Sequence, residues 1–323
     1  MKRTLTVLLA LLLCMLPLAA CSSSGEPKPE TTGDTSQPAD ASAGESDAAR
    51  EDVGKQTILV VSFGTSYPET RALTIEAIEQ AIAAAFPDYD LRRAFTSQII
   101  INKLAERDGI EIDNVEQAMQ RLVEDGVSKL IIQPTHVMHG YEYEELLAAV
   151  APYADKIENL MIGEPMLAGT QDYDRVVEAV IAEYAPAEDT ALVLMGHGTH
   201  HPANAYYAAL DYRFKVSGYS NVFVGTVEGY PEVDTVLALV NAAGYQKVAL
   251  APLMIVAGDH ATNDMAGDEE GSWKVIFKAD GKEVDTILRG LGEIEGIHAL
   301  YVEHVQAAID SLEGSGADEA ESE

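Results

Sequence analysis

The chain has 323 residues, of which 53 are acidic and 21 are lysine or arginine, and its formal net charge is −32 at pH 7. This charge argues against nucleic-acid binding, because that affinity depends largely on lysine and arginine contacts with phosphate. The two cysteines, Cys14 and Cys21, lie near the N-terminus, so the rest of the chain has no disulfide framework and any transition metal there must be bound by imidazole and carboxylate groups.

Residues 1–20 have the features of a bacterial signal peptide. Two basic residues precede an apolar run at Leu5–Leu16, which is shorter than the roughly 20 residues that a membrane-spanning helix needs. The run leads to Leu-Ala-Ala-Cys at 18–21, which resembles the lipobox of bacterial lipoproteins and implies a lipid on Cys21. The alternatives are an ordinary signal peptide and an uncleaved anchor. In each case we expect export, and with the lipid we expect attachment to the periplasmic or extracellular face of a membrane.

The next segment has the composition of a linker. Residues 22–52 contain no aromatic residue and no Leu, Ile, Val or Met, so they have nothing with which to form a core. We expect a disordered linker at 21–53, beginning with the lipidated Cys21. At the other end, residues 314–323 are predicted to form a solvated acidic tail.

Between these ends, apolar runs rich in β-branched residues alternate with helical patterns. In chain order, the sequence predicts a strand at 57–63, a helix at 68–86, a strand at 90–96, a helix at 115–126 and a strand at 129–135. Ser66 and Glu69 have the spacing of a capping box for the first helix. The alternation indicates βαβ units and parallel sheets, which is an α/β fold.

The same order of elements recurs in the second half of the chain. Residues 61–68 align with 195–202, residues 93–97 with 224–228, and residues 126–142 with 244–260. The repeat predicts two similar α/β domains, at 54–185 and 186–313, each a parallel sheet flanked by helices, with a cleft between them.

The strand ends of the two halves carry different side chains. At the matched positions the first half has Phe63, Ser97 and Glu142, whereas the second half has His197, Glu228 and His260. Ligands of open α/β sheets bind beyond the carboxyl ends of the strands. Two imidazoles and a carboxylate at that edge suit Co²⁺, Ni²⁺, Fe²⁺ or Zn²⁺, and the ligands alone do not fix which metal is physiological.

Other histidines are less informative. His200 and His201 fall at the start of the helix that follows His197, and we expect them to point away from the cleft. His298 and His304 lie in the C-terminal helical region, and their positions indicate no role.

Several longer motifs resemble the anaerobic sirohydrochlorin cobaltochelatases, the class II chelatases of the CbiK type. They are ILVVSFGTSY (58–67), RAFTSQIIINKLAERDGI (93–110), MGHG (195–198), VEGYPEVD (227–234) and PLMIVAGDHATNDM (252–265). The resemblance covers residues 56–310. It implies two related α/β domains and ATP-independent insertion of Co²⁺ into sirohydrochlorin in anaerobic cobalamin synthesis. It also implies that His197, Glu228 and His260 are the metal ligands and catalytic residues.

The implied substrate is a polycarboxylate, which a chain of this charge repels unless basic residues lie near the cleft. Arg93, Lys103 and Arg213 are the candidates for this role, and an ordinary surface charge is the alternative for each. Tyr207, together with the nearby Tyr206 and Tyr212, is a candidate for contact with the macrocycle, with core packing as the alternative.

His136 lies in a segment where family members also have a histidine, and the resemblance makes it the first candidate for a haem ligand. His139 lies three residues later, which permits a second ligand if that turn is helical. A structural or exposed role is the alternative for both residues.

The expected export does not fit a cytoplasmic pathway. We therefore keep two hypotheses: an exported, membrane-anchored cobaltochelatase, and a membrane-anchored protein that binds haem, another tetrapyrrole or metal without turnover. A generic metal-binding protein is a third interpretation, which does not account for the long motifs. The sequence is compatible with a homo-oligomer.

Overall fold

The computed structural model describes residues 55–320, with side chains described as far as residue 314. The predicted signal peptide (1–20), Cys21 and the predicted linker (21–53) lie outside the described residues. Within 55–320, none of the helices is both long and apolar enough to span a membrane.

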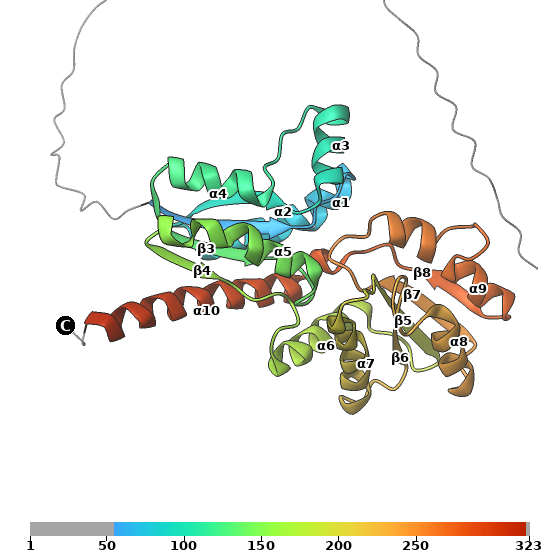
Figure 1. Ribbon diagram of the computed structural model, residues 1–323. Helices are drawn as coiled ribbons and strands as arrows, with labels where there is room; N and C mark the ends of the chain where they lie inside the picture. The colour runs from blue at the N-terminus through green and yellow to red at the C-terminus, as the bar shows by residue number, and fades with distance from the viewer. Residues whose placement is uncertain (1–54, 321–323) are drawn as a thin grey trace, which may run out of the picture. The chain divides into compact units, whose positions relative to one another are not determined.

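Two four-stranded parallel sheets form the framework of this region (Figure 1). The first has the order β2-β1-β3-β4 and the second the order β6-β5-β7-β8. Their strands are β1 (Lys55–Ser62), β2 (Asp90–Phe95), β3 (Val127–Pro134), β4 (Asn159–Ile162), β5 (Thr190–Gly196), β6 (Val222–Thr226), β7 (Lys247–Pro252) and β8 (Glu283–Thr286). The predicted fold class, two similar parallel α/β halves, is confirmed.

Helices connect the strands in both halves. The first half contains α1 (Pro68–Leu73), α2 (Ile75–Ala85), α3 (Gln98–Asp108), α4 (Val115–Glu124), α5 (Tyr141–Val150), η1 (Ala151–Lys156) and α6 (Thr170–Tyr184). The second contains η2 (Pro202–Asn204), α7 (Ala205–Val216), α8 (Val233–Ala242), η3 (Ala261–Met265), α9 (Trp273–Ala279), η4 (Leu291–Glu293) and α10 (Glu295–Ala320).

The strand pairing has the same register in the two halves. Val61 of β1 lies opposite Pro134 of β3, and Met195 of β5 lies opposite Pro252 of β7. Because these pairs occupy matching positions in the two halves, the carboxyl ends of the strands lie at equivalent places in the two sheets.

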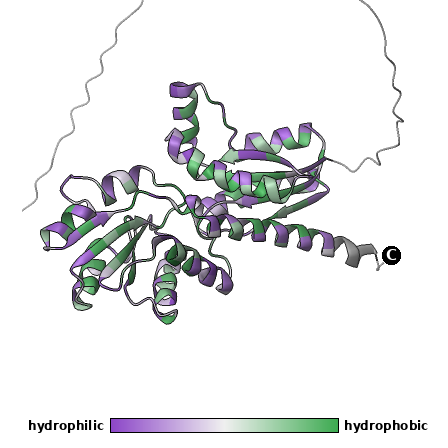
Figure 2. Cartoon of the chain, turned by 180° about the vertical axis from the view of Figure 1, so that it is seen from behind, coloured by the Kyte–Doolittle hydropathy of each residue, from purple (hydrophilic) through white to green (hydrophobic). Residues whose placement is uncertain are grey.

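Strand β1 shows why both faces of a sheet are covered. Ile58 and Val60 face a core that includes residues of α2, whereas Leu59 and Val61 face residues of α4 and α5. All four side chains are fully buried, as expected for a central parallel strand, which is apolar on both faces. Figure 2 shows the apolar residues gathered on the strands and on the helix faces turned towards them.

Helix α10 packs against the first sheet, although its residues up to 313 fall in the range predicted for the second domain. It contacts α2, β3 and β4, and its apolar face places Ile297, Tyr301 and Val305 in a core to which both halves contribute. Since α2 leaves part of this face of the sheet uncovered, α10 supplies the missing apolar surface. The acidic segment that begins at residue 314 continues α10 as far as Ala320.

The predicted helix at 68–86 is divided in two. Helix α1 ends at Leu73, Thr74 has a φ of −118°, and α2 begins at Ile75. The predicted capping box is wrong, because the N-cap of α1 is Tyr67 and no side chain caps it. Pro68 occupies the first turn of α1. A backbone N–H at this position would have no acceptor within the helix, so a proline there loses no helical hydrogen bond.

Candidate metal centre and cleft

Three adjacent strands of the second sheet position the predicted ligand residues. His197 directly follows β5, Glu228 lies two residues beyond β6, and His260 precedes η3 after the loop that follows β7. The backbone N–H of Glu228 donates to the carbonyl of His197 over 2.7 Å, so these two loops are tied together. One ligand atom from each residue lies within 4.8 Å of the others.

The three side chains face an open space. Nε2 of His197 lies 3.9 Å from Oε2 of Glu228, and the rings of His197 and His260 meet edge to face with centroids 4.8 Å apart. Their side chains are 45%, 56% and 33% exposed, in the order His197, Glu228 and His260. Ligand atoms around one tetrahedral ion lie about 3.4 Å apart, so small side-chain rotations would bring this set onto a single ion.

Both histidines present the same ring nitrogen. Nδ1 of His197 lies 2.8 Å from the carbonyl oxygen of Gly198, and Nδ1 of His260 lies 2.7 Å from Oδ2 of Asp264. A carbonyl or a carboxylate accepts, so Nδ1 carries the hydrogen in each ring. The lone pair is therefore on Nε2, which is the atom available to a metal.

Gly198 allows the loop after β5 to pass close to its neighbour. Its φ is +85°, and a Cβ at this position would lie 2.4 Å from the backbone nitrogen of Gly229. Its N–H donates to the hydroxyl of Tyr207 over 3.3 Å. Tyr207 is buried, and this burial raises the pKa of its hydroxyl, so the group stays protonated and holds the loop.

The ligand set opens into a cavity of about 830 Å³ that both halves line. From the first half, the polar and aromatic lining residues include Phe63, Tyr67, Lys103, His136, Tyr141 and Glu142. From the second half they include His197, His200, Tyr207, Glu228, Asp259 and His260. Ile75, Ile100, Leu253 and Val256 add apolar surface, so the cavity combines flat apolar walls with a few polar groups, as ligand pockets do.

Contacts between the halves lie beside this cavity. The hydroxyl of Tyr67 donates to Oδ1 of Asp259 over 3.4 Å. His201 lies 3.2 Å from a carboxylate oxygen of Glu144 and packs edge to face on the ring of Tyr141. The cleft is therefore bridged by polar pairs.

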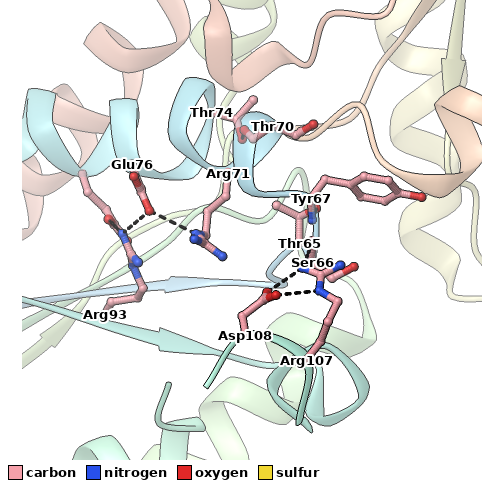
Figure 3. Close-up of polar contacts among 11 residues, drawn as sticks. Thr65, Ser66, Tyr67, Thr70, Arg71, Thr74, Glu76, Arg93, Arg107 and Asp108 are labelled. Carbon is pink, nitrogen blue, oxygen red and sulfur yellow. Dashed lines mark hydrogen bonds and ion pairs between the residues drawn. The ribbon is translucent and has the colours of Figure 1, made fainter. Parts of the chain in front are cut away.

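Lys103 is the one lysine or arginine among the described residues that line the cavity. It lies on helix α3, whose end is held by Arg107: Nη2 of Arg107 donates to the carbonyl of Ser66 over 2.5 Å, and its guanidinium pairs with Asp108 (Figure 3). Within residues 55–314, no carboxylate lies at ion-pair distance from Lys103. Its charge is thus available to a ligand in the cavity.

The structure corrects the expectation for the other two basic candidates. The guanidinium of Arg93 pairs with the carboxylate of Glu79 and also approaches Glu76 (Figure 3). That of Arg213 pairs with Asp174. Neither arginine lines the cavity, because each strand or helix turns its basic side chain towards a carboxylate on a neighbouring helix.

Tyr207 lines the cavity, whereas the neighbouring Tyr206 and Tyr212 do not. The hydroxyl of Tyr206 lies 3.5 Å from Nδ1 of His139, and Tyr212 is exposed on α7. Neither of these two belongs to the cavity wall.

His136 lines the cavity, and both of its ring nitrogens are buried without a hydrogen-bond partner among the described residues. Burial lowers its pKa to about 4, against a smaller opposing effect of Glu142, so the ring is neutral at pH 7. His139 lies outside the cavity wall, with Nε2 2.6 Å from Glu164.

The remaining histidines have structural contacts, with one exception. His200 lies on the cavity wall, so the expectation that it lies away from the cleft is wrong. His298 lies 2.6 Å from the carbonyl of Gly292, and His304 lies 3.2 Å from Asp172.

Two acidic residues near the site were not predicted as functional. Glu142, known from the sequence only as the counterpart of His260, lines the cavity from the first half. Asp264 contacts His260, and its spacing of four residues from that histidine is a signal that the sequence contained.

A cavity between two parallel α/β halves, with two histidines and a glutamate at three neighbouring strand ends, defines an α/β protein of metal-handling type. The sequence profile of the family described as cobalt chelatase (CbiK) matches residues 56–310. The chain belongs to this family.

Curated relatives agree with the match. A sirohydrochlorin cobaltochelatase of Salmonella typhimurium is 43% identical over 257 residues, which are 79% of this chain and 97% of the relative. The sirohydrochlorin cobaltochelatase CbiKC of Nitratidesulfovibrio vulgaris is 34% identical over 264 residues, which are 80% of this chain and 92% of the relative.

Solved structures share the fold at low identity. SirB from Bacillus subtilis with Fe³⁺ has a TM-score of 0.56 at 15% identity, covering 80% of this chain and 98% of that one. The sirohydrochlorin chelatase SirB from Bacillus subtilis subspecies spizizenii in complex with cobalt has a TM-score of 0.55 at 16% identity, covering 80% and 97%. At sequence identities this low, the structural similarity shows a shared fold and nothing more specific.

Proposed function

We propose that this protein inserts Co²⁺ into sirohydrochlorin without ATP, as a step of anaerobic cobalamin synthesis. The observation that carries the proposal is the convergence of His197, Glu228 and His260, with ligand atoms within 4.8 Å of one another, at the wall of a large cavity. The 43% identity to a curated sirohydrochlorin cobaltochelatase supports both the metal and the tetrapyrrole.

The reaction exchanges one set of ligands for another. Co²⁺ enters bound to the two Nε2 atoms and the Glu228 carboxylate, and the four ring nitrogens of the tetrapyrrole replace these ligands one at a time. Two pyrrole N–H protons leave as the ion enters, so the charge of the macrocycle core balances that of the metal. The very stable chelate supplies the free energy, and no nucleotide is needed.

The two protons need acceptors close to the ring. A histidine that has released the metal regains a free lone pair on Nε2, which accepts a proton. Glu228 does the same, and Glu142 of the first half offers a further carboxylate in the cavity lining. The protons therefore have acceptors from both halves of the protein.

Lys103 and Tyr207 complete the proposed substrate site. The ammonium of Lys103 pairs with a peripheral carboxylate of the tetrapyrrole, which offsets the repulsion from Glu142, Glu228 and Asp259. Tyr207 supports the floor of the cavity beside His197. The ligand set is also compatible with Fe²⁺ or Ni²⁺, so the metal delivered in the cell depends on supply as well as on affinity.

The test uses a soluble protein that begins at Asp52, mixed anaerobically with sirohydrochlorin and Co²⁺ while the visible spectrum is followed. We expect multiple turnovers above the spontaneous rate, and their loss in His197→Ala and His260→Ala. His200→Gln is the matched control, because His200 lines the cavity but lies outside the ligand set. Activity retained in both alanine variants would overturn the proposed ligand roles.

The same experiment distinguishes a carrier from an enzyme. Tight binding of sirohydrochlorin, haem or cobalt at one equivalent, without turnover, would identify a binding protein and overturn the proposed catalysis. Haem binding through His136 would then be recognised by its loss in His136→Leu. Light scattering of the same protein measures whether it forms a homo-oligomer.

We also propose that the protein acts outside the cytoplasm, anchored through lipid on Cys21. The basic start, the apolar run and the Leu-Ala-Ala-Cys sequence at 18–21 support this location. Expression with labelled fatty acid should label the wild type in the membrane fraction. Cys21→Ser should carry no label, and equal labelling of the two proteins would contradict the anchor.

A further inference from the structure

The two histidines of the proposed metal site have unlike partners. The Nδ1 hydrogen of His197 is donated to the neutral carbonyl of Gly198. That of His260 is donated to the carboxylate of Asp264 over 2.7 Å. Hydrogen bonds to a charged acceptor are roughly twice as strong as those between neutral groups, so His260 is held more firmly than His197.

We propose that Asp264 is a positioning residue, which makes His260 the anchoring ligand of the metal. The inference rests on the proposed function of the site. A carboxylate behind a ligating imidazole fixes the ring orientation, keeps the hydrogen on Nδ1 and increases electron donation from Nε2. During transfer, the metal leaves His197 and Glu228 first and His260 last.

The backbone holds Asp264 in place. Helix η3 is a π-helix, in which the N–H of Ala266 reaches the carbonyl of Ala261 five residues before it. Ala261 and Met265 are fully buried in the core of the second half. These buried residues on either side fix the turn, so the separation of Asp264 from His260 does not depend on a mobile loop.

The carboxylate is also free of competing cations. Within residues 55–314, no lysine or arginine forms an ion pair with Asp264, and His260 is its one charged or polar side-chain partner there. Asp268, four residues further along the chain, differs in this respect because it pairs with Lys274. Asp264 therefore has its charge available to the histidine.

The first experiment measures Co²⁺ binding alone, by calorimetric titration of the protein that begins at Asp52. Loss of such an outer partner typically weakens metal binding 10–100-fold, and we expect a change of about that size for Asp264→Ala. Asp264→Asn, which keeps an oxygen acceptor, should lose less. Asp268→Asn is the matched control and should bind as the wild type does.

Two further readouts separate positioning from folding. The thermal midpoint of the metal-free protein should be the same for Asp264→Ala and the wild type. The ¹⁵N shifts of His260 should show hydrogen on Nδ1 in the wild type and a shift towards Nε2 in Asp264→Ala. The double variant His260→Ala/Asp264→Ala should bind Co²⁺ no more weakly than His260→Ala alone.

The outcomes distinguish this inference from the proposed function. If the wild type bound no Co²⁺, the metal site itself would be overturned, and the role of Asp264 with it. If the wild type and Asp264→Ala bound Co²⁺ equally, with the same His260 tautomer, the positioning role alone would be overturned. A weakened affinity that persisted in the His260→Ala background would also overturn it.

Discussion

The hydroxyl of Tyr67, in the loop after β1, donates a hydrogen bond to Asp259, in the loop after β7. The bond joins the two halves of the protein one residue before the proposed ligand His260. Both side chains line the cavity. A contact between the two halves therefore lies next to the proposed metal site.

Removing this contact should change exchange rates more than stability. Tyr67→Phe should alter the free energy of unfolding by less than about 1 kcal/mol, because a partly exposed polar pair contributes little. Stopped-flow displacement should show faster release of bound tetrapyrrole, with Co²⁺ affinity unchanged. Tyr212→Phe, on the exposed face of α7, is the control. An unchanged release rate would show that the pair does not restrict the cleft.

Lys103 should govern affinity for the acidic substrate. Lys103→Met should raise the KM for sirohydrochlorin about tenfold with little change in kcat, since hydrogen bonds to charged groups contribute about 1.5–3 kcal/mol. Lys103→Arg should retain most of the affinity. Fluorescence titration with sirohydrochlorin and with its methyl ester provides the check, because the ester should bind both proteins alike. An equal loss for acid and ester would instead indicate a steric effect.

His136 should make stability depend on pH below neutrality. Its pKa in the folded protein is about 4, whereas an unfolded histidine has a pKa near 6.5. Between these values the unfolded chain binds more protons, so the free energy of unfolding falls as the pH is lowered through this window. The full effect is at most about 3 kcal/mol.

Urea denaturation at pH 7 and pH 4.5 measures this contribution. His136→Leu should be within about 1 kcal/mol of the wild type at pH 7, since an apolar group replaces two unpartnered nitrogens. It should lose less stability than the wild type at pH 4.5. Parallel losses in the two proteins would show that His136 is not the group responsible.

Gly198 should be required for the metal site. A Cβ there would collide with the backbone of Gly229, so Gly198→Ala should displace the loops that carry His197 and Glu228 and should weaken Co²⁺ binding at least tenfold. Gly218→Ala is the matched control: its φ is +95°, yet nothing lies within 4 Å of the added Cβ. It should cost about 1 kcal/mol of stability and leave metal affinity unchanged.

The repeat and the parallel fold were predictable because they depend on local patterns. Apolar runs such as that of β1 mark buried strands, and the matched Pro134 and Pro252 give the register of the two sheets. The convergence of His197 and His260 follows from the same alignment, since equivalent strand ends meet at one edge of a sheet. The family match of residues 56–310 agrees with the motifs that the sequence contains.

Side-chain partners over long distances were not predictable. The role of Arg93 depends on the orientation of Glu79 across the α2–β2 packing, and that of Arg213 on Asp174 of another helix. The place of His200 on the cavity wall depends on the conformation of a loop that contains Gly198, a glycine with positive φ. The position of α10 depends on which sheet face is left uncovered, and no local pattern contains that information.

Helix α10 also gives the protein an order of assembly. The fully buried Tyr301 donates its hydroxyl hydrogen to the carbonyl of Thr135, in the first half, and α10 covers the first sheet (Figure 1). The segment that completes the first sheet thus follows the last strand of the second sheet in the chain. A growing chain cannot bury all the apolar surface of its first sheet until residues beyond β8 have been synthesised.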